Sequence, residues 1–418
     1  MSDGRVYVVG GGLAGLSAAV ALAEKGVATT LIEGTGQAGG RCRSYFDATL
    51  GQVIDNGNHL LLSGNHATHD YLRTIGATDK LAGPERARFA FADVRSGERW
   101  MIAPNDGPLA WWVLAKNRRV PGSSLSEYLS LLKLLAPGKG KRIDEVVSCQ
   151  GPLWEKLLHP FLLAALNTEP QSASADLAAA VIRETLAKGG RAYCPRIATP
   201  HLGAAFIEPA LAYLKTKGAE VQFGRRLRAV AFEGKRAATL EFTDGPLPLG
   251  QNDRVILATP AWVTAELLPG TPAPTEFRAI VNAHFVAAPP TGAAPMVGVI
   301  GGTAEWVFAF HDRLSVTVSG ADRLVDTDRE TLARTLWSDV AAVHGLGPEL
   351  PPWQIVKERR ATFAATPEQN ARRPGARTGW TNLILAGDWT GTGLPATIEG
   401  AVRSGQRAAQ LARADQSV

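Results

Sequence analysis

Residues 5–33 constrain the fold more than any other stretch of the chain. A short β-branched and aromatic run at residues 6–9 stops at three consecutive glycines, and residues 16–25 then have the Ala- and Leu-rich composition of a helix. A second strand is expected over residues 28–32, and it ends at Glu33. This order of strand, glycine turn, helix, strand and acid predicts a βαβ unit of an α/β fold.

The glycines of this turn follow the pattern Gly-x-Gly-x-x-Gly. Gly10 permits the tight turn, Gly12 lets a pyrophosphate approach the backbone, and Gly15 lets the helix pack closely on the strand. Free N–H groups at the helix start, near Leu13 and Ala14, would face the phosphates together with the positive end of the helix dipole. The spacing alone is unspecific, but in this context it predicts dinucleotide binding.

Glu33 and the residues after it narrow the choice of dinucleotide. A carboxylate at the end of the second strand can accept from ribose hydroxyls and would repel a 2'-phosphate, which favours FAD or NAD. A second glycine pair with cations, Gly39, Gly40 and Arg41, then stands where an NAD dehydrogenase would continue its crossover. Here the chain resembles the FAD-dependent amine oxidase and carotenoid desaturase superfamily, although a glycine loop with solvated arginines is the plainer alternative.

The C-terminal region carries the second strong motif. A short buried strand at residues 382–386 stops at Gly387 and Asp388, and a helix is expected from Thr397 and Ile398 onward. Gly387 would let the backbone approach the ligand, and Asp388 would hold a ribityl hydroxyl or orient the diphosphate. The helix N-terminus would stabilise negative charge on the flavin. This motif also resembles the FAD superfamily.

The resemblance implies further site residues. Gly57, Asn58 and His59 would lie near the isoalloxazine ring, with Asp55 beside them, although Asp55 and His59 can equally serve to cap a turn. Val230 stands where the superfamily contacts adenine through the backbone. Arg360 either faces the substrate cavity or forms a surface ion pair. The run Asp55–His59 and residues 160–174 resemble one branch of the superfamily, the hydroxysqualene dehydroxylases.

The same resemblance divides the chain into two interleaved parts. We expect a Rossmann-like, glutathione-reductase-like FAD-binding domain from residues 1–65, 191–265 and 376–418, and an α+β substrate-binding domain with a helical cap from residues 66–190 and 266–375. Residues 66–190 are expected to be mostly helical. Within them, Trp111 and Trp112 beside Lys116, Arg118 and Arg119 indicate either core packing of the cap or an interfacial segment at a membrane.

Composition bounds the function classes. The 418 residues are 45% hydrophobic with a formal net charge of +5, which is typical of a folded protein without nucleic-acid binding. Three scattered cysteines indicate neither a disulfide framework nor a metal site, and they favour a reducing cytoplasm. No leader is evident and no apolar run approaches the ~18 residues of a membrane span, so any contact with the inner face of the cytoplasmic membrane would be peripheral.

The implied activity is reduction of hydroxysqualene to squalene by noncovalent FAD, in squalene and hopanoid biosynthesis. In this hypothesis His59 protonates the leaving hydroxyl and Asp55 orients His59. The chain is also expected to associate with the synthases that supply this long-chain isoprenoid. One alternative is a carotenoid or phytoene desaturase, which uses flavin in the oxidising direction. An amine oxidase or a non-catalytic prenyl-lipid-binding protein agrees less well with the motifs. The oligomeric state and the electron donor for FAD stay open.

Overall fold

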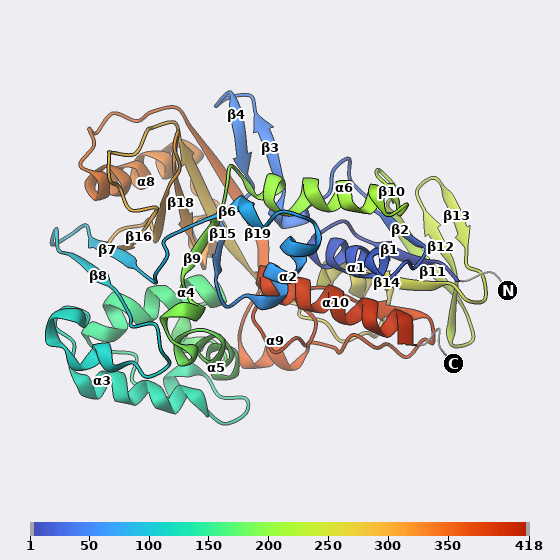
Figure 1. Cartoon of the computed structure of the whole chain (residues 1–418), viewed down its shortest axis with the longest axis horizontal. Helices are drawn as coiled ribbons and strands as arrows, with labels where there is room; N and C mark the ends of the chain where they lie inside the picture. The colour runs from blue at the N-terminus through green and yellow to red at the C-terminus, as the bar shows by residue number, and fades with distance from the viewer. Residues whose placement is uncertain (1–3, 415–418) are drawn as a thin grey trace.

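The computed structural model of the chain describes residues 4–414. A five-stranded parallel sheet forms one half of the molecule (Figure 1). Its strands, in spatial order, are β10 (Glu220–Gln222), β2 (Thr29–Ile32), β1 (Val6–Val9), β14 (Arg254–Leu257) and β20 (Leu383–Leu385). Every neighbouring pair is parallel, so all five carboxyl ends meet at one edge. The strands predicted near each of these positions are confirmed.

Helices pack closely around this sheet. α1 (Leu13–Glu24) contacts both α6 (Glu208–Thr216) and α10 (Ile398–Ala414), and α2 (His66–Thr74) contacts α10. A Cβ atom at Gly405 of α10 would lie 2.1 Å from the carbonyl oxygen of Ala14, so only glycine permits this approach of α10 to α1. The helix predicted from residue 16 begins three residues earlier, directly after the glycine turn.

A seven-stranded mixed sheet forms the other half. Its spatial order is β19 (Trp353–Phe363), β15 (Phe277–Phe285), β18 (Leu314–Val318), β17 (Trp306–Ala309), β16 (Met296–Ile300), β7 (Phe89–Asp93) and β8 (Arg99–Ile102). The helix α8 (Arg329–His344) packs on it through Leu336, Trp337 and Val340, which are buried. The second sheet predicted from residues 277–318 is therefore confirmed.

The expectation of a mostly helical segment over residues 66–190 is wrong for residues 81–102. β6 (Leu81–Ala82), β7 and β8 lie there, and β7 pairs in parallel with β16. The alternation in residues 89–93 is short, and only its long-range partner makes it a strand. The remainder of the segment is helical, with α3 (Leu125–Ser130), the 3-10 helices η3 (Trp111–Leu114) and η5 (Leu131–Leu135), α4 (His159–Leu166) and α5 (Ala175–Glu184).

Smaller elements complete the fold. They are the hairpin β3 (Ser44–Asp47) and β4 (Gln52–Asp55), the sheet of β5 (Leu60–Leu62), β9 (Pro195–Ala198) and β6, the antiparallel sheet of β11 (Leu227–Glu233), β12 (Arg236–Phe242) and β13 (Gly245–Pro248), and the short helices α7 (Ala261–Leu267) and α9 (Pro367–Ala371). The division of the chain into two interleaved domains stays a proposal, and α2, which follows residue 65, packs on the helices of the parallel sheet.

Candidate active site

The carboxyl edge of the parallel sheet brings together the three motifs that the sequence analysis selected. Gly10 follows β1, Glu33 follows β2, and Gly387 comes two residues after β20. In open parallel sheets this edge is where ligands bind, because loops diverge there and helix N-termini point toward it. Gly387 is more than 350 residues from the other two in sequence and is their neighbour only because the strands are parallel.

Backbone without side chains lines the centre of this edge. Gly10 has a φ of +111°, and a Cβ at Gly15 would lie 1.8 Å from the Gly10 carbonyl oxygen, so both glycines are required by the turn itself. Gly12 differs, because a Cβ added there meets nothing within 4 Å. Gly40 stands opposite, since its own added Cβ would lie 3.4 Å from the Gly12 Cα. The space beside Gly12 is therefore open and bounded by peptide groups.

The start of α1 supplies donors to this open space. Gly12 is the N-cap residue and provides no side-chain cap, so the first N–H groups of the helix have no side-chain cap bond from that residue. Peptide N–H groups at a helix N-terminus, next to a surface that a Cβ would fill, fit a diphosphate group. The residues at this edge therefore fit the diphosphate of FAD.

Glu33 reaches back to the glycine turn. Its Oε2 accepts from the Gly11 N–H at 2.7 Å, and its Oε1 accepts from the N–H and the hydroxyl of Thr35, both at 2.8 Å. These bonds hold the carboxylate at the edge, where its remaining lone pairs can accept from ribose hydroxyls. The chain leading to β11 is tied to the same place, because the Arg225 N–H donates to the Glu33 carbonyl at 3.1 Å. Val230 lies within β11, paired with Leu240 of β12.

An ion pair connects the second glycine pair with the C-terminal motif. The guanidinium of Arg41 donates to the Asp388 carboxylate at 2.7 Å and to the Ala361 carbonyl of β19 at 2.5 Å. The Asp388 side chain is buried, whereas that of Arg41 is 40% exposed. Although burial lowers the pKa of Arg41, the charge and hydrogen bond of Asp388 outweigh it, so the pKa is raised and the cation persists.

Arg373 shapes the loop that carries Asp388, and the sequence analysis did not identify it. Its guanidinium donates to the carbonyl oxygens of Asp388 at 3.1 Å and Thr390 at 2.5 Å and lies over the Phe363 ring at 4.7 Å. Burial lowers the pKa of Arg373 to about 10, which still leaves it charged at neutral pH. A single cation thus satisfies carbonyls that the tight turn after β20 leaves without sheet partners.

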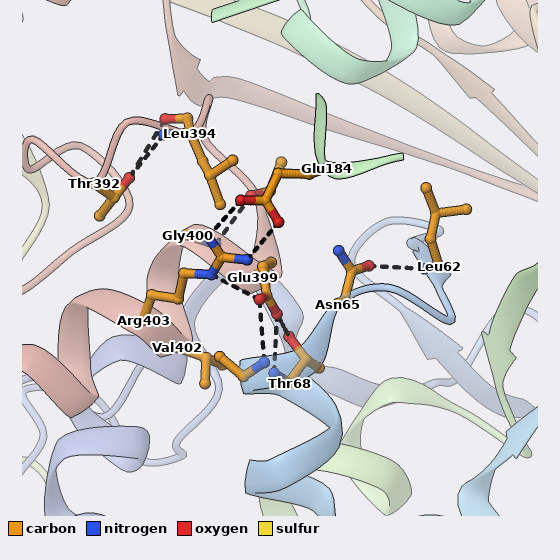
Figure 2. A network of polar contacts seen from close by, with 12 residues as sticks. Leu62, Asn65, Thr68, Glu184, Thr392, Leu394, Glu399, Gly400, Val402 and Arg403 are labelled. Carbon is orange, nitrogen blue, oxygen red and sulfur yellow. Dashed lines mark hydrogen bonds and ion pairs between the residues drawn. The ribbon is translucent and has the colours of Figure 1, made fainter. Parts of the chain in front are cut away.

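The N-terminus of α10 is fixed by the motif residues and by a buried network (Figure 2). The Thr397 hydroxyl accepts from the Gly400 N–H at 3.0 Å, next to Ile398 at the first helical position. Glu399 is 4% exposed, and its carboxylate accepts four hydrogen bonds, from Ala67 N, Thr68 N, the Thr68 hydroxyl and Arg403 Nε. The network therefore ties α10 to the start of α2.

Arg403 extends this network to the cap. Its terminal nitrogens donate to both carboxylate oxygens of Glu184 at the end of α5, at 3.0 and 2.8 Å. These hydrogen bonds raise the pKa of Arg403 and lower that of Glu184. The network thereby joins three helices from distant parts of the chain, α2, α5 and α10.

Asp55–His59 joins the two halves of the molecule. The Asn58 side chain donates to the Thr317 hydroxyl at 3.1 Å, and the Asn282 side chain donates to the Asn56 carbonyl at 3.4 Å. Asn282 is 1% exposed and lies so close that a Cβ at Gly57 would be 3.0 Å from its amide nitrogen. The predicted segment is therefore fixed against β15 and β18 of the seven-stranded sheet.

Asp55 does not orient His59 in this structure, contrary to the hypothesis from the sequence. The Asp55 carboxyl accepts from the Ser44 hydroxyl at 2.5 Å and from the Leu202 N–H at 3.0 Å, which caps the turn leading to the Gly203–Ile207 π-helix. Burial raises the pKa of Asp55. The alternative interpretation, in which Asp55 caps a turn, matches these contacts, because Asp55 Oδ1 accepts hydrogen bonds from the hairpin and from the helix start.

His59 lies beside Cys42 and Arg41. Its Nε2 is 3.9 Å from the Cys42 Sγ, and burial, assisted by the Arg41 charge, lowers the pKa of His59 to about 4. Burial raises the pKa of the Cys42 thiol to about 12, so the pair is a neutral imidazole and a neutral thiol at pH 7. His59 is thus next to Arg41, a predicted cofactor contact. The protonated imidazolium of His59 is scarce at pH 7.

Arg360 is exposed, and within residues 4–414 it does not form the surface ion pair, whereas its position toward a substrate cavity stays a prediction. Its guanidinium lies 5.0 Å from the centre of the Trp262 ring and 5.8 Å from that of Phe277. The neighbouring Arg359 forms the surface ion pair, with Asp326 at 2.7 Å. Stacking on two aromatic rings fits the weak hydration of a guanidinium.

Comparison with known proteins supports the interpretation of the chain as a flavoprotein. The family model for flavin containing amine oxidoreductases matches residues 13–412. Hydroxysqualene dehydroxylase of Rhodopseudomonas palustris is 54% identical over 97% of each chain, and those of Sinorhizobium fredii and Zymomonas mobilis are 51% and 50% identical over 97–98%. The chain belongs to the hydroxysqualene dehydroxylase family. It is therefore an FAD-dependent oxidoreductase, as the glycine cradle, Glu33 and Asp388 indicate.

Solved structures of related flavoenzymes share the fold of this hydroxysqualene dehydroxylase family member. Cyclohexylamine oxidase from Brevibacterium oxydans superposes with a TM-score of 0.69 over 99% of each chain at 14% identity. Wild-type putrescine oxidase gives 0.68 over 97% of this chain and 98% of that one at 19% identity. The expected α/β fold of the amine oxidase superfamily is confirmed.

Within residues 4–414 no cluster of three or more His, Cys, Asp and Glu side chains could hold a metal ion. None of the helices in that range is long and apolar enough to cross a membrane.

Proposed function

We propose that this protein reductively removes the hydroxyl group of hydroxysqualene and releases squalene and water. The observation that carries the proposal is identity of 50–54% to three hydroxysqualene dehydroxylases over nearly the whole chain. In the reaction an allylic C–O bond breaks, a C–H bond forms and the oxygen leaves as water once protonated. Reduced FAD, when bound, supplies the two electrons and the hydrogen for carbon.

The residues of the chain have three tasks in this proposal. The backbone at Gly12 and the start of α1 hold the diphosphate, with Glu33 on the ribose. Asp388, oriented by its ion pair with Arg41, accepts from a ribityl hydroxyl. The buried hydrogen bonds of Asn58 and Asn282 fix Asp55–His59 against the seven-stranded sheet, so that this segment is rigid where substrate and flavin meet.

His59 is our candidate for handling the proton. The pKa of about 4 leaves roughly one imidazole in a thousand protonated at pH 7, which corresponds to about 4 kcal/mol if the imidazolium is the donor. A bound anionic diphosphate near Arg41 would offset part of that cost, because the charge of Arg41 contributes to the lowered pKa. His59 has Cys42, not Asp55, as its side-chain neighbour in this role.

The test is anaerobic incubation of the chemically reduced holoprotein with hydroxysqualene, followed by lipid extraction. Squalene should appear as the flavin absorbance returns. The competing activity is a desaturase reaction, since a phytoene desaturase of an Oncidium hybrid is 23% identical over 97% of this chain. A flavin that stays reduced with hydroxysqualene, but is bleached when the oxidised protein meets phytoene, would establish that alternative.

Two finer features belong to the same proposal. A hydrocarbon substrate of this length is nearly insoluble in water, so the protein would work at the inner face of the cytoplasmic membrane, in a peripheral position. It would receive the substrate from the synthase that forms it. Comigration of the purified holoprotein with that synthase on a sizing column tests the association.

A further inference from the structure

Five exposed apolar side chains lie close together in sequence, in or next to η3, α3 and η5. Among residues 4–414, nine large hydrophobic side chains are exposed, and five of them fall within residues 109–132. Their exposed fractions run from 58% to 78%. We call this group the apolar patch, and it consists of Leu109, Trp111, Leu114, Leu129 and Leu132. Scattered exposed hydrophobic residues are ordinary, whereas a concentration of this kind indicates an interaction surface.

The patch residues of η3 and α3 are brought together in space by their buried neighbours. Trp112 is buried, and its ring meets that of Tyr128 edge-on with centroids 5.8 Å apart. The Tyr128 hydroxyl in turn accepts from the Val120 N–H at 3.0 Å. Because Trp112 and Tyr128 point inward, the adjacent Trp111 and Leu129 point outward on the same joined unit. Trp112 thus packs in the core, as one of the two alternatives from the sequence predicted, whereas Trp111 is exposed.

The segment that carries the patch is rich in positive charge. Residues 109–141 contain six Lys and Arg and a single acid, Glu127, so their net charge equals the +5 of the entire chain. Lys116, Lys133, Lys139 and Lys141 are all exposed. Glu127 accepts local hydrogen bonds from Ser124 and from the Leu153 N–H, and within residues 4–414 it forms no ion pair with these cations.

Trp111 combines both properties. The guanidinium of Arg118 lies 5.3 Å from the centre of its indole ring, while the ring itself is 58% exposed. An indole with a cation on it and leucines beside it matches the region between lipid headgroups and acyl chains. Figure 1 shows α3 at the end of the molecule opposite both termini, so the parallel sheet does not obstruct this face.

We propose that the apolar patch and its lysines dock the protein on an anionic lipid surface. Trp111 and the leucines enter the acyl boundary, and Lys116, Lys133 and Lys139 contact anionic headgroups. The proposal rests in part on the proposed function, because a lipid-dissolved substrate requires access to a membrane, but docking can be measured without any substrate.

The test compares binding of the oxidised holoprotein to two kinds of vesicle, phosphatidylcholine alone and phosphatidylcholine mixed with phosphatidylglycerol. Co-sedimentation should be strong only with the anionic vesicles and should weaken with added salt. Trp111→Ser with Leu132→Ser should abolish it. Replacing Lys116, Lys133 and Lys139 by Gln should weaken it about fivefold per residue, roughly 100-fold together.

Matched controls use exposed residues elsewhere. Phe46→Ser with Phe223→Ser removes apolar surface outside the patch, and a triple Gln replacement of Lys25, Lys215 and Lys217 removes the same charge. Both control proteins should bind the anionic vesicles as wild type does. Retained flavin absorbance confirms that each variant is folded.

Several results would overturn the proposal. They are wild-type protein that stays in the supernatant with anionic vesicles, controls that lose as much binding as the patch variants, or a dimer that Trp111→Ser dissociates while vesicles remain unbound. The last result would assign the patch to a second copy of the chain. Turnover of detergent-solubilised hydroxysqualene separates docking from chemistry: patch variants should keep it, and its loss in them would also contradict a docking role. If wild-type protein bound vesicles but never turned over this substrate, only the proposed reaction would fail.

Discussion

Replacing Glu399 by glutamine should destabilise the protein far more than its distance from the reacting atoms suggests. The side chain is 4% exposed, with Oε1 accepting from Ala67 N and Arg403 Nε and Oε2 accepting from the N–H and hydroxyl of Thr68. A glutamine amide keeps one oxygen and turns a donor group toward the other two donors. We therefore expect Glu399→Gln to break the network at one side.

The cost follows from the less damaging of the two amide orientations. With the amide nitrogen toward Thr68, the hydroxyl rotates to accept from it, but the buried Thr68 N–H is left unsatisfied, at about 1–3 kcal/mol. Arg403 also loses one of its two carboxylate partners, which at 31% exposure adds less than about 1 kcal/mol. The free energy of unfolding should fall by about 1–4 kcal/mol. Because the unfolding entropy of a 418-residue chain is about 0.9 kcal/mol/K, the Tm should fall by about 1–5 °C.

Thermal unfolding of the holoprotein followed by circular dichroism measures this change, and FAD titration of the apoprotein should show weaker binding because α10 begins at the flavin edge. Glu184→Gln is the matched control. It touches Arg403 from the other side but is 30% exposed, so it should cost less than about 1 kcal/mol. The reasoning is refuted if Glu399→Gln shifts Tm by under a degree, or if both variants cost the same.

The remaining predictions concern the cofactor and the proton. Gly12→Ala should leave the apoprotein as stable as wild type, since the added Cβ meets nothing, but it should abolish FAD binding. Gly15→Ala should prevent stable folding, because the added Cβ overlaps the Gly10 carbonyl. Equal stability of the two variants would contradict these different roles of the glycines. Acid precipitation should release a yellow supernatant, and flavin retained on the pellet would exclude noncovalent binding. His59→Ala should lower the single-turnover rate at least about 100-fold, and an effect within a factor of about three, under 1 kcal/mol, would remove His59 from the mechanism. Because burial and Arg41 lower its pKa, the wild-type rate should also fall as pH rises above about 4, and a flat profile from pH 5 to 8 would tell against an imidazolium donor.

The parts of the site that sequence reasoning predicted are those encoded locally. The spacing of Gly10, Gly12 and Gly15 alone indicates the tight turn that requires glycine. Glu33 and Asp388 each come after a strand that its β-branched or Leu-rich composition predicts. Parallel strands bring such ends together whatever the loops do. The edge of the site could therefore be located before any tertiary contact was known.

The parts that it missed depend on contacts between distant segments. Nothing near Asp55 in the sequence indicates that its carboxyl meets Leu202, and nothing near Glu399 indicates Thr68 or Glu184. Arg373 had one usable signal, a cation shortly before a strand that ends in a tight Gly-Asp turn. β7 and β8 were lost in a segment of helical composition, because their strand character comes from pairing with β16.

The most direct test of the account is the amount of squalene formed per flavin reoxidised in one anaerobic turnover. Reduced holoprotein would be mixed with excess hydroxysqualene, with the flavin followed by absorbance and the lipid quantified after quenching. One squalene should form for each flavin that returns to the oxidised form, and none should form in the Gly12→Ala protein. A flavin that reoxidises without squalene, or remains reduced while hydroxysqualene is recovered unchanged, would contradict reductive dehydroxylation at this site.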